Sequence, residues 1–422
     1  MSAPTHLPVV VVGGSQAGLA ASHCLARRGI AHLVFEKDRV AQRWIDQRWE
    51  SFCLVTPNWQ CTLPGFSYTA EYGGRDPDGF MRRDEIVEYI RAYRRHVDPP
   101  LLEDTAVERV SRRGERFLID AGGERYTADA VIVATGGYHV PRIPPLARAL
   151  PERVLQLHSS TYRSPDALPD GDVLVVGNGQ SGCQIAEDLL LGGRRVHLAV
   201  GGAPRAPRRY RGRDVTAWLV DMGHYDVTVD EHPQGEAVRR KVNHYMTGRD
   251  GGREIDLRAF ATRGMRLHGR LVGVEGTELR FDESLGRNLD GADAAAERIK
   301  DEIDRWIEAE GVAAPPREPW APVWAPEPGP STLEAGDGTL GTVVWATGFG
   351  TDYGWMDLPV LDGTGYPDHW RGASRRVDDV YFLGLPWMVT WGSGRFSGVA
   401  RDAEYVVARI AETRRLAERA SA

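Results

Sequence analysis

The chain opens with an apolar run, a glycine-rich turn, a helical stretch and a second apolar run. PVVVV (8–12) is continuous and β-branched, which is typical of a strand buried on both faces of a parallel sheet. AGLAASHCLARRG (17–29) has helical spacing and stops at a glycine, and AHLVFEKD (31–38) predicts another strand. Together these segments have the length of one βαβ unit.

A second copy of this pattern lies at 172–200, DVLVVGNGQSGCQIAEDLLLGGRRVHLAV. Two shorter segments, 129–145 and 341–355, each contain a strand that runs into Ala-Thr-Gly. Further along, 293–311 and 401–420 have helical patterns, and the proline-rich 314–330 predicts an extended connector. The repeat therefore predicts an α/β protein with two Rossmann-like dinucleotide-binding domains.

Composition and charge argue against nucleic-acid-binding, membrane-spanning and metal-binding classes of protein, and they do not identify an activity. The 422 residues are 42% hydrophobic and 26% charged, with a net charge of -7, which argues against nucleic acid as a partner. No apolar stretch approaches the ~20 residues of a membrane span, and no signal peptide is evident. The four cysteines form no C-x-x-C, and the spacing of the histidines from His224 to His268 predicts no metal site. We expect a soluble, cytoplasmic protein with reduced thiols.

The first glycine loop predicts a dinucleotide with free ribose hydroxyls. Gly13 allows a tight turn and Gly18 close packing of helix on strand, while the small Ser15 replaces the usual middle glycine. Pyrophosphate would lie at the N-terminus of the following helix. Glu36 comes 23 residues after Gly13 (36 − 13), where a carboxylate can accept hydrogen bonds from ribose hydroxyls.

The second loop predicts a different nucleotide. Twenty-three residues after Gly177 the chain has Val200, then Gly201 and Gly202, and an arginine-rich segment. A carboxylate would repel a ribose 2′-phosphate, whereas arginines bind one bidentately. We therefore expect NADPH here, with NADH left open. The arginines nominated for the 2′-phosphate are Arg205, Arg208 and Arg209.

With both loops, Glu36 and the two Ala-Thr-Gly segments, the chain resembles the class B flavoprotein monooxygenases, which bind FAD and use NADPH. The resemblance runs through RWIDQRWESFCLVTPNWQCTLPG (43–65), ATGGYHVPRIPP (134–145), LHSSTYRSP (157–165) and VVWATGF (343–349). The segment 248–260 and the ending 382–403 are similar to a narrower bacterial group of flavin-dependent oxidoreductases, often encoded beside nitrilases.

The resemblance implies that FAD lies on the first loop and NADPH on the second. Together with the residue patterns, it gives one set of cofactor-binding candidates: Gly13, Gly14, Ser15, Gln16, Ala17, Gly18, Glu36, Lys37, Arg43, Trp44, Val107, Ala134, Thr135, Gly136, His158, Tyr162, Gly177, Asn178, Gly179, Gln180, Ser181, Gly182, Arg205, Arg208, Arg209, Ala346, Thr347, Gly348 and Ser397.

The family's chemistry implies a monooxygenase in which NADPH reduces FAD and a flavin C4a-(hydro)peroxide transfers one oxygen atom. The fingerprint F-x-G-x-x-x-H-x-x-x-(W/Y) is half present: His158 and Tyr162 match, whereas Glu152 and Val154 replace phenylalanine and glycine. This favours nitrogen or sulfur over carbon as the acceptor. Thr56 and Asn58 are the catalytic candidates, as hydrogen-bond partners of the reacting group.

Two other functions stay open on the sequence. An NAD(P)H-dependent flavoprotein reductase would need a redox pair such as Cys53 and Cys61, and a nucleotide-binding redox sensor would turn over slowly. We expect a small-molecule substrate and O2 as partners, with no nucleic acid and no membrane, and leave a homo-oligomer open. The expected domains are 1–155 and 336–422 for FAD, and 156–335 for NADPH with a lid or substrate insertion near 225–330.

Overall fold

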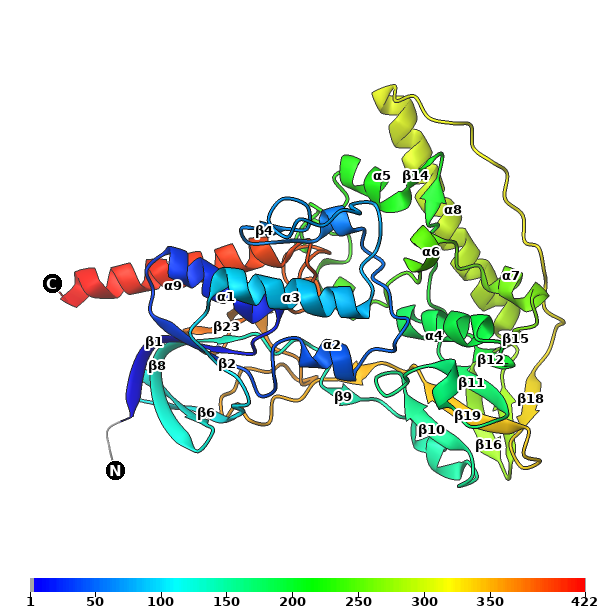
Figure 1. Cartoon of the computed structure of the whole chain (residues 1–422), viewed down its shortest axis with the longest axis horizontal. Helices are drawn as coiled ribbons and strands as arrows, with labels where there is room; N and C mark the ends of the chain where they lie inside the picture. Colours follow the sequence, from blue (N-terminus) through cyan, green and yellow to red (C-terminus); the bar gives the residue numbers. More distant parts are fainter. Residues whose placement is uncertain (1–3, 422) are drawn as a thin grey trace.

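The computed structural model describes residues 4–421 and contains two bodies, each built on its own sheet (Figure 1). The first sheet has nine strands, with the path β21-β22-β23-β8-β1-β2-β5 and with β6 and β7 continuing from β8. β1 lies at its centre, parallel to both β2 and β8. Its strands are β1 (Thr5–Val12), β2 (His32–Phe35), β5 (Leu101–Leu102), β6 (Val107–Arg113), β7 (Arg116–Ala121), β8 (Glu124–Val133), β21 (His369–Trp370), β22 (Ala373–Ser374) and β23 (Val380–Phe382).

The second sheet repeats this design with five strands in the order β10-β19-β11-β12-β15, all parallel to their neighbours. Here β11 takes the place that β1 has in the first sheet, between β12 and β19. Its strands are β10 (Leu155–His158), β11 (Asp172–Val176), β12 (Val196–Ala199), β15 (Arg266–His268) and β19 (Leu340–Trp345).

The helices cover these sheets and extend beyond them (Figure 1). α9 packs on α1 in the first body, and α4 packs on β11 and β12 in the second. The long α8 ends in a left-handed Gly311, after which the proline-rich connector runs back to β18. The helices are α1 (Gln16–Arg27), α2 (Gln42–Asp46), α3 (Arg83–Val97), α4 (Gln180–Leu191), α5 (Val215–Asp221), α6 (Arg249–Gly252), α7 (Leu257–Thr262), α8 (Leu285–Glu310) and α9 (Val399–Ser421), with 3-10 turns η1 (Asn58–Gln60), η2 (Pro145–Ala149), η3 (Pro165–Ala167) and η4 (Gly235–Arg240).

Short antiparallel pairs complete the fold. The most important for the site is the pair of β9 (Val140–Pro141) with β20 (Phe349–Gly350), which joins the two stretches of chain that cross between the bodies. The others are β3 (Thr62–Leu63) with β4 (Phe66–Ser67), β13 (Arg209–Tyr210) with β14 (Arg213–Asp214), and the sheet of β16 (Leu271–Glu275), β17 (Glu278–Phe281) and β18 (Ser331–Glu334).

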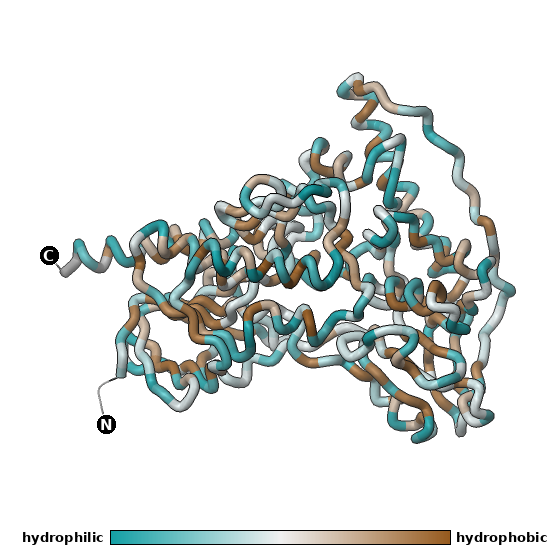
Figure 2. Tube along the Cα trace, viewed as in Figure 1, coloured by the Kyte–Doolittle hydropathy of each residue, from teal (hydrophilic) through white to brown (hydrophobic). Residues whose placement is uncertain are grey.

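The β-branched runs form the cores, as their pattern predicts. All of Val9–Val12 and all of Asp172–Val176 are buried, because each sheet is covered on both faces. In the second sheet, Val173 and Val175 pack with helix α4, whereas Leu174 and Val176 pack with β17. Figure 2 shows these strands as brown segments inside the more hydrophilic helices. Full burial of one valine side chain contributes on the order of 1.5–3 kcal/mol, so these strands are a main source of stability.

Sheet membership moves one of the expected domain boundaries. The boundary expected at 335/336 would place 340–345 in the first body, but β19 lies between β10 and β11 at the heart of the second sheet. The chain returns to the first body only after Gly348. The stretch expected as an insertion, 225–330, is also not wholly separate, because β15 is an edge strand of the second sheet. Within residues 4–421, every helix is too short or too polar to span a bilayer.

Candidate cofactor-binding site

The two glycine loops have the same backbone geometry. Gly13 and Gly177 both have positive φ, +107° and +102°, which glycine adopts without strain. The Gly13 nitrogen donates to the Phe35 oxygen at 2.7 Å, and the Gly177 nitrogen donates to the Ala199 oxygen at 3.1 Å. Each loop is thus tied to the end of the strand that follows its helix, so the sequence repeat is also a repeat in space.

Two further glycines allow helix and loop to touch. A Cβ atom at Gly18 would lie 1.7 Å from the Gly13 oxygen, and one at Gly182 would lie 1.8 Å from the Gly177 oxygen. Both distances are far shorter than any real carbon–oxygen contact, so only glycine permits this packing. The role predicted for the third glycine of each motif therefore has a direct steric basis at both loops.

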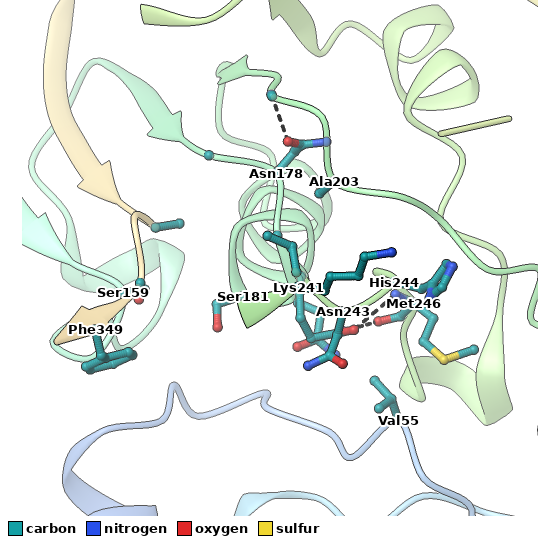
Figure 3. A pocket seen from close by; sticks show the side chains of 18 of the residues that line it. Val55, Ser159, Asn178, Ser181, Ala203, Lys241, Asn243, His244, Met246 and Phe349 are labelled. Atoms are coloured by element: carbon teal, nitrogen blue, oxygen red, sulfur yellow. Dashed lines mark hydrogen bonds between the residues drawn. The ribbon is translucent and has the colours of Figure 1, made fainter. Parts of the chain in front are cut away.

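Helices α1 and α4 begin at these loops with unsatisfied donors. The N-cap residues Ser15 and Gly179 are extended and make no side-chain capping bond. The first N–H groups of an uncapped helix, together with the helix dipole, form a binding place for an anion such as pyrophosphate. Ala17 is buried behind the first loop, and Ser181 lies at the start of α4 on the cavity wall (Figure 3).

At the first loop, the Glu36 carboxylate lies beside the glycine turn, at the end of β2. Its Oε2 accepts from the Gly14 nitrogen at 2.7 Å and its Oε1 from the Asp38 nitrogen at 3.1 Å. Lys37 is exposed and its ammonium lies 3.7 Å from the Asp38 carboxylate. The backbone of Thr105 donates to the Glu36 oxygen, which brings the start of β6, with Val107, alongside this edge.

The second loop reverses this arrangement. Asn178 Oδ1, on the loop, accepts from the Gly201 nitrogen at 2.7 Å, a bond drawn as a dashed line in Figure 3. The amide nitrogen of Asn178 is buried and has no partner. No acidic residue follows directly after β12, and the loop keeps one buried donor without a partner, the Asn178 amide nitrogen.

Arg270 occupies the space that the missing acid leaves. A Cβ atom on Gly202 would lie 3.5 Å from Arg270 Nη2, and one on Gly201 would lie 3.9 Å from Arg270 Nε. The guanidinium is exposed, and no ion pair among residues 4–421 involves it. The sequence pattern pointed to the arginine-rich segment 205–213 and not to Arg270. Arg270 follows β15, and no local pattern predicts that β15 lies beside β12.

The three nominated arginines have other contacts. Arg205 is buried and pairs with Glu254 and Asp293, both at 2.9 Å. Arg208 is buried, donates to Asp214 and to the Val55 oxygen, and stacks on a phenylalanine ring. Arg209 is exposed and donates to the Gly251 oxygen at 3.0 Å. Carboxylates thus already neutralise the two buried guanidiniums. None of the three arginines is among the described residues that line the cavity beside the second loop, whereas Arg270 is.

The glutamine at the start of each helix connects a distant segment to its loop. Gln16 donates to the Gly394 oxygen at 3.4 Å and accepts from the Ser15 hydroxyl, which brings the turn before α9, with Ser397, to the first loop. Gln180 donates to the Met246 oxygen and accepts from the Met246 nitrogen. The two equivalent glutamines thus attach the C-terminal turn and the 241–248 segment to the cofactor loops.

The two Ala-Thr-Gly segments close each loop from behind. The Ala134 oxygen lies 2.6 Å from the Cβ position of Gly13, and the Ala346 oxygen lies 2.8 Å from that of Gly177. The Thr135 hydroxyl is buried without a partner, whereas the Thr347 hydroxyl donates to the Arg142 oxygen. Gly136 and Gly348 follow with φ of +74° and +81° and turn the chain toward β9 and β20.

Arg43 and Trp44 lie between the first loop and the cavity. Arg43 Nη2 donates to the Tyr138 oxygen at 2.9 Å, and its Nε is buried without a partner. The Trp44 indole stacks on Phe396 with centroids 6.1 Å apart and meets Phe52 edge-on. Buried orphan donors at Arg43 and Thr135, beside a loop only glycine can form, are what a missing polar ligand would leave.

The two catalytic candidates differ in what their side chains contact. Asn58 is buried, its Nδ2 donates to the Asp76 oxygen at 2.9 Å, and its Oδ1 accepts from the Met81 nitrogen at 2.8 Å. Its carboxamide is therefore used to hold the 76–81 loop in place. Thr56 is also buried, in the turn just before η1.

His158 and Tyr162 connect parts of the scaffold. His158 lies against the Gly348 oxygen at 3.0 Å and the Ser160 hydroxyl at 2.9 Å, and burial lowers its pKa. The Tyr162 hydroxyl donates to Asp188 at 2.7 Å. Both residues of the half-fingerprint therefore fix the second domain against its linker and helix α4.

Asp188 is the meeting point of three donors from separate segments. Besides Tyr162 it accepts from the Ser51 hydroxyl at 2.5 Å and pairs with Arg249 at 2.7 Å. Ser51 belongs to the first body, and Asp188 belongs to helix α4 of the second. This buried carboxylate therefore bonds the two bodies to each other.

A cavity of about 1130 Å³ lies between the bodies and is large enough for a nicotinamide nucleotide with a small substrate. The Gly177–Gly182 loop forms one wall, the 52–55 segment of the first body another, and the turn holding Trp387 and Trp391 a third. Figure 3 shows Ser181, Lys241 and His244 around this space, with Val55 on the opposite side.

The cysteines have no reactive surroundings. Cys24, Cys53, Cys61 and Cys183 are free and buried. Burial raises the pKa of the Cys53 thiol and of the Cys61 thiol to about 12, and each points to a backbone oxygen, of Phe80 and Pro57. Thiolates are the nucleophiles in disulfide exchange, so this pair is poorly suited to it.

Comparison with known proteins agrees with this geometry. Residues 10–254 match the model of the pyridine nucleotide-disulphide oxidoreductase family. An uncharacterized oxidoreductase, CzcO-like, from Geobacillus kaustophilus is 31% identical over 402 residues, covering 94% of this chain and 97% of that protein.

Two solved structures share the fold. The flavin-containing monooxygenase from Stenotrophomonas maltophilia superposes with a TM-score of 0.66 at 20% identity, covering 97% of this chain and 99% of that one. The ornithine N-hydroxylase of Kutzneria sp. 744, determined with reduced FAD, NADP+ and L-ornithine, has a TM-score of 0.63 at 18% identity and covers 97% and 100%. The chain therefore belongs to the pyridine nucleotide-disulphide oxidoreductase family, with the two-domain dinucleotide-binding fold of the flavin monooxygenases.

Proposed function

We propose that this protein is an FAD- and NADPH-dependent monooxygenase that oxygenates a small molecule at nitrogen or sulfur. The observation that carries the proposal is the difference in charge between two loops with the same backbone geometry. One has the Glu36 carboxylate at its ribose edge, and the other has two glycines under the Arg270 guanidinium. Two seats of opposite charge in one chain suit a cofactor with free ribose hydroxyls and a 2′-phosphorylated co-substrate.

The FAD seat would be formed by the first loop and α1, with Glu36 at the ribose and the helix N-terminus at the pyrophosphate. Arg43, Trp44, Thr135 and Ser397 would lie along the flavin half. The unpartnered Arg43 and Thr135 atoms support this assignment.

The NADPH seat would be formed by the second loop and α4, with Arg270 at the 2′-phosphate and the free Asn178 amide nitrogen toward the nucleotide. An exposed, unpaired guanidinium can bind a phosphate bidentately without first breaking an ion pair. Arg205 and Arg208 would have to break theirs, which supports Arg270 in their place.

When bound, the flavin, once reduced by the nicotinamide, supplies the activation of O2. The protein's part is then to position, to exclude water and to offer hydrogen bonds. Trp387, Trp391 and Phe52 give the cavity apolar walls, and Trp44 packs against Phe52 and Phe396. Thr56 is our candidate for a hydrogen bond to the reacting group, and Asn58 is a positioning residue for that segment.

The buried thiols speak against the reductase alternative, because a pKa of about 12 leaves Cys53 and Cys61 protonated at neutral pH. The test is turnover with NADPH and isotope-labelled O2 over a panel of small amines and sulfides. We expect one labelled oxygen atom in a product and less H2O2 per NADPH when an accepted substrate is present. Quantitative H2O2 formation that no amine or sulfide reduces would overturn the proposal.

A further inference from the structure

The cavity between the two bodies has strongly cationic walls. Among its described lining residues, Glu302 is the single carboxylate, and its side chain is exposed. The seven arginines and lysines are Arg48, Arg142, Arg239, Arg240, Lys241, Arg270 and Arg395. Such an excess of one charge in a confined space attracts anions.

Part of this charge is already accounted for. Arg270 lies at the predicted 2′-phosphate, and both pyrophosphates would lie at helix N-termini. Arg239 pairs with Glu236 at 3.1 Å, and Arg240 pairs with Asp362 at 3.4 Å. The other four, Arg48, Arg142, Lys241 and Arg395, take part in no ion pair among residues 4–421. Arg142 and Lys241 are exposed, whereas Arg48 and Arg395 are half-buried against aromatic rings.

Aromatic rings and backbone oxygens hold both guanidiniums in place. Arg48 lies over Trp44 and Phe52, 5.2 and 5.5 Å from the ring centroids, and donates to the Gln47 oxygen at 2.8 Å. Arg395 lies 3.8 Å over Trp391 and donates to the oxygen of the same residue. A stacked guanidinium is oriented in advance, so it loses little freedom when it binds an anion.

The two arginines line the same cavity, each on its own group of aromatic rings. Trp44, which carries Arg48, stacks on Phe396, the residue next to Arg395. Trp391, which carries Arg395, packs against Tyr225 at 4.6 Å. Loss of hydration lowers the pKa of Arg48 and of Arg395, which means that their charged forms are not fully compensated by the protein.

We propose that Arg48 and Arg395 together bind the carboxylate of an anionic substrate whose apolar part lies against Trp391 and Tyr225. The proposal rests on the proposed function for the place of the substrate, and it adds a substrate class: small amines or sulfides that also carry a carboxylate. A guanidinium fork matches a carboxylate with paired charge-assisted hydrogen bonds. Trp391 and Tyr225 line the same cavity and offer the apolar surface that the rest of the molecule needs.

The test compares two probes that differ only in charge, (phenylthio)acetate and (phenylthio)acetamide, by calorimetry on the FAD-loaded protein with NADP+. We expect the acid to bind at least about tenfold more tightly than the amide. Arg48→Met and Arg395→Met should each weaken binding of the acid by about tenfold or more. The affinity for the amide should stay within about threefold of that of the unaltered protein. Arg240→Gln, which removes a charge already paired in the same cavity, should keep the preference.

Equal binding of acid and amide to the unaltered protein would overturn the proposal, and this comparison needs no variant to fold. Loss of FAD from Arg48→Met or Arg395→Met would also overturn it, since that guanidinium would then serve the cofactor. Acid preference without oxygen transfer would support the carboxylate site and count against the proposed function. Oxygen transfer without a preference for the acid would support the proposed function and overturn the carboxylate site.

Discussion

Asn178 Oδ1 accepts a hydrogen bond of 2.7 Å from the backbone nitrogen of Gly201, the mirror image of the bond that Gly14 donates to Glu36. In the first domain the side chain that closes the loop comes from the strand, and in the second it comes from the loop. This exchange removes the acid from the second ribose edge and leaves room for Arg270. We therefore expect the choice between NADPH and NADH to depend on Arg270.

Arg270→Ala should raise the KM for NADPH by about 10- to 100-fold, because a charge-assisted pair with the 2′-phosphate is lost. The KM for NADH, which lacks that phosphate, should change little. Arg266→Ala is the matched control, because Arg266 is an exposed arginine of β15, the strand just before Arg270. Steady-state kinetics with both nucleotides measure this, and an equal loss for NADH would contradict the assignment.

Gly18→Ala and Gly182→Ala form a matched pair for the two seats. Each places a methyl group less than 2 Å from a backbone oxygen, 1.7 Å from that of Gly13 and 1.8 Å from that of Gly177. We expect Gly18→Ala to purify without flavin and Gly182→Ala to retain it while NADPH reduces it at least about tenfold more slowly, as helix and loop are forced apart. Flavin absorbance and rapid-mixing reduction separate the outcomes, and a reversed pattern would exchange the two assignments.

Asp188→Ala should be strongly destabilising. The change leaves Tyr162, Ser51 and Arg249 without a shared acceptor in a buried place, which typically costs about 3–5 kcal/mol. Glu275→Ala, which breaks the exposed pair with Arg280, should cost less than about 1 kcal/mol. Urea unfolding of both variants measures this difference, and similar losses would show that Asp188 contributes no more than a surface pair.

Asp402 gives stability a pH dependence of known sign. It is fully buried in α9, and burial raises its pKa to about 7, although the nearby Ser393 hydroxyl reduces the rise. The unfolded carboxyl titrates near about 4, so the folded state binds the extra proton between these values. Its stabilising contribution is full below about pH 4 and is lost as the pH rises through about 7.

Asp402→Asn should remove this dependence. Relative to the unaltered protein, we expect the variant to gain a few kcal/mol in free energy of unfolding between about pH 4 and 8, on the order of 1.4 kcal/mol per pH unit at most. Chemical unfolding at a series of pH values gives the difference, in which titrations of other groups cancel. A difference that does not change with pH would mean that Asp402 stays ionised.

The sequence was sufficient for whatever depends on local backbone geometry. Each β-branched run and its glycine loop lie within a single βαβ unit, and Glu36 ends the first of the two units, so spacing alone predicted them. Arg270 could not be found in this way, because it reaches the second loop only through the pairing of β12 with β15, more than 60 residues apart in the chain. The prediction for Arg205 could not foresee that Glu254 and Asp293, from distant segments, pair with it. The prediction for Arg208 overlooked the nearby Asp214, which pairs with it in the structure.

The same distinction applies to the catalytic candidates and to the second domain boundary. Nothing local to Asn58 shows that its carboxamide bonds to residues 76 and 81. Strand 340–345 has the pattern of either sheet, and only its pairing with β10 and β11 assigns it to the second.

The chain crosses between the bodies twice, and the crossings pair as β9 and β20 directly after the two Ala-Thr-Gly segments. A two-stranded ribbon twists and bends more easily than it stretches, so it would act as a hinge. Each crossing begins at a carbonyl pressed against the first glycine of a cofactor loop. Any swing of one body relative to the other would therefore be transmitted to both nucleotide seats at once.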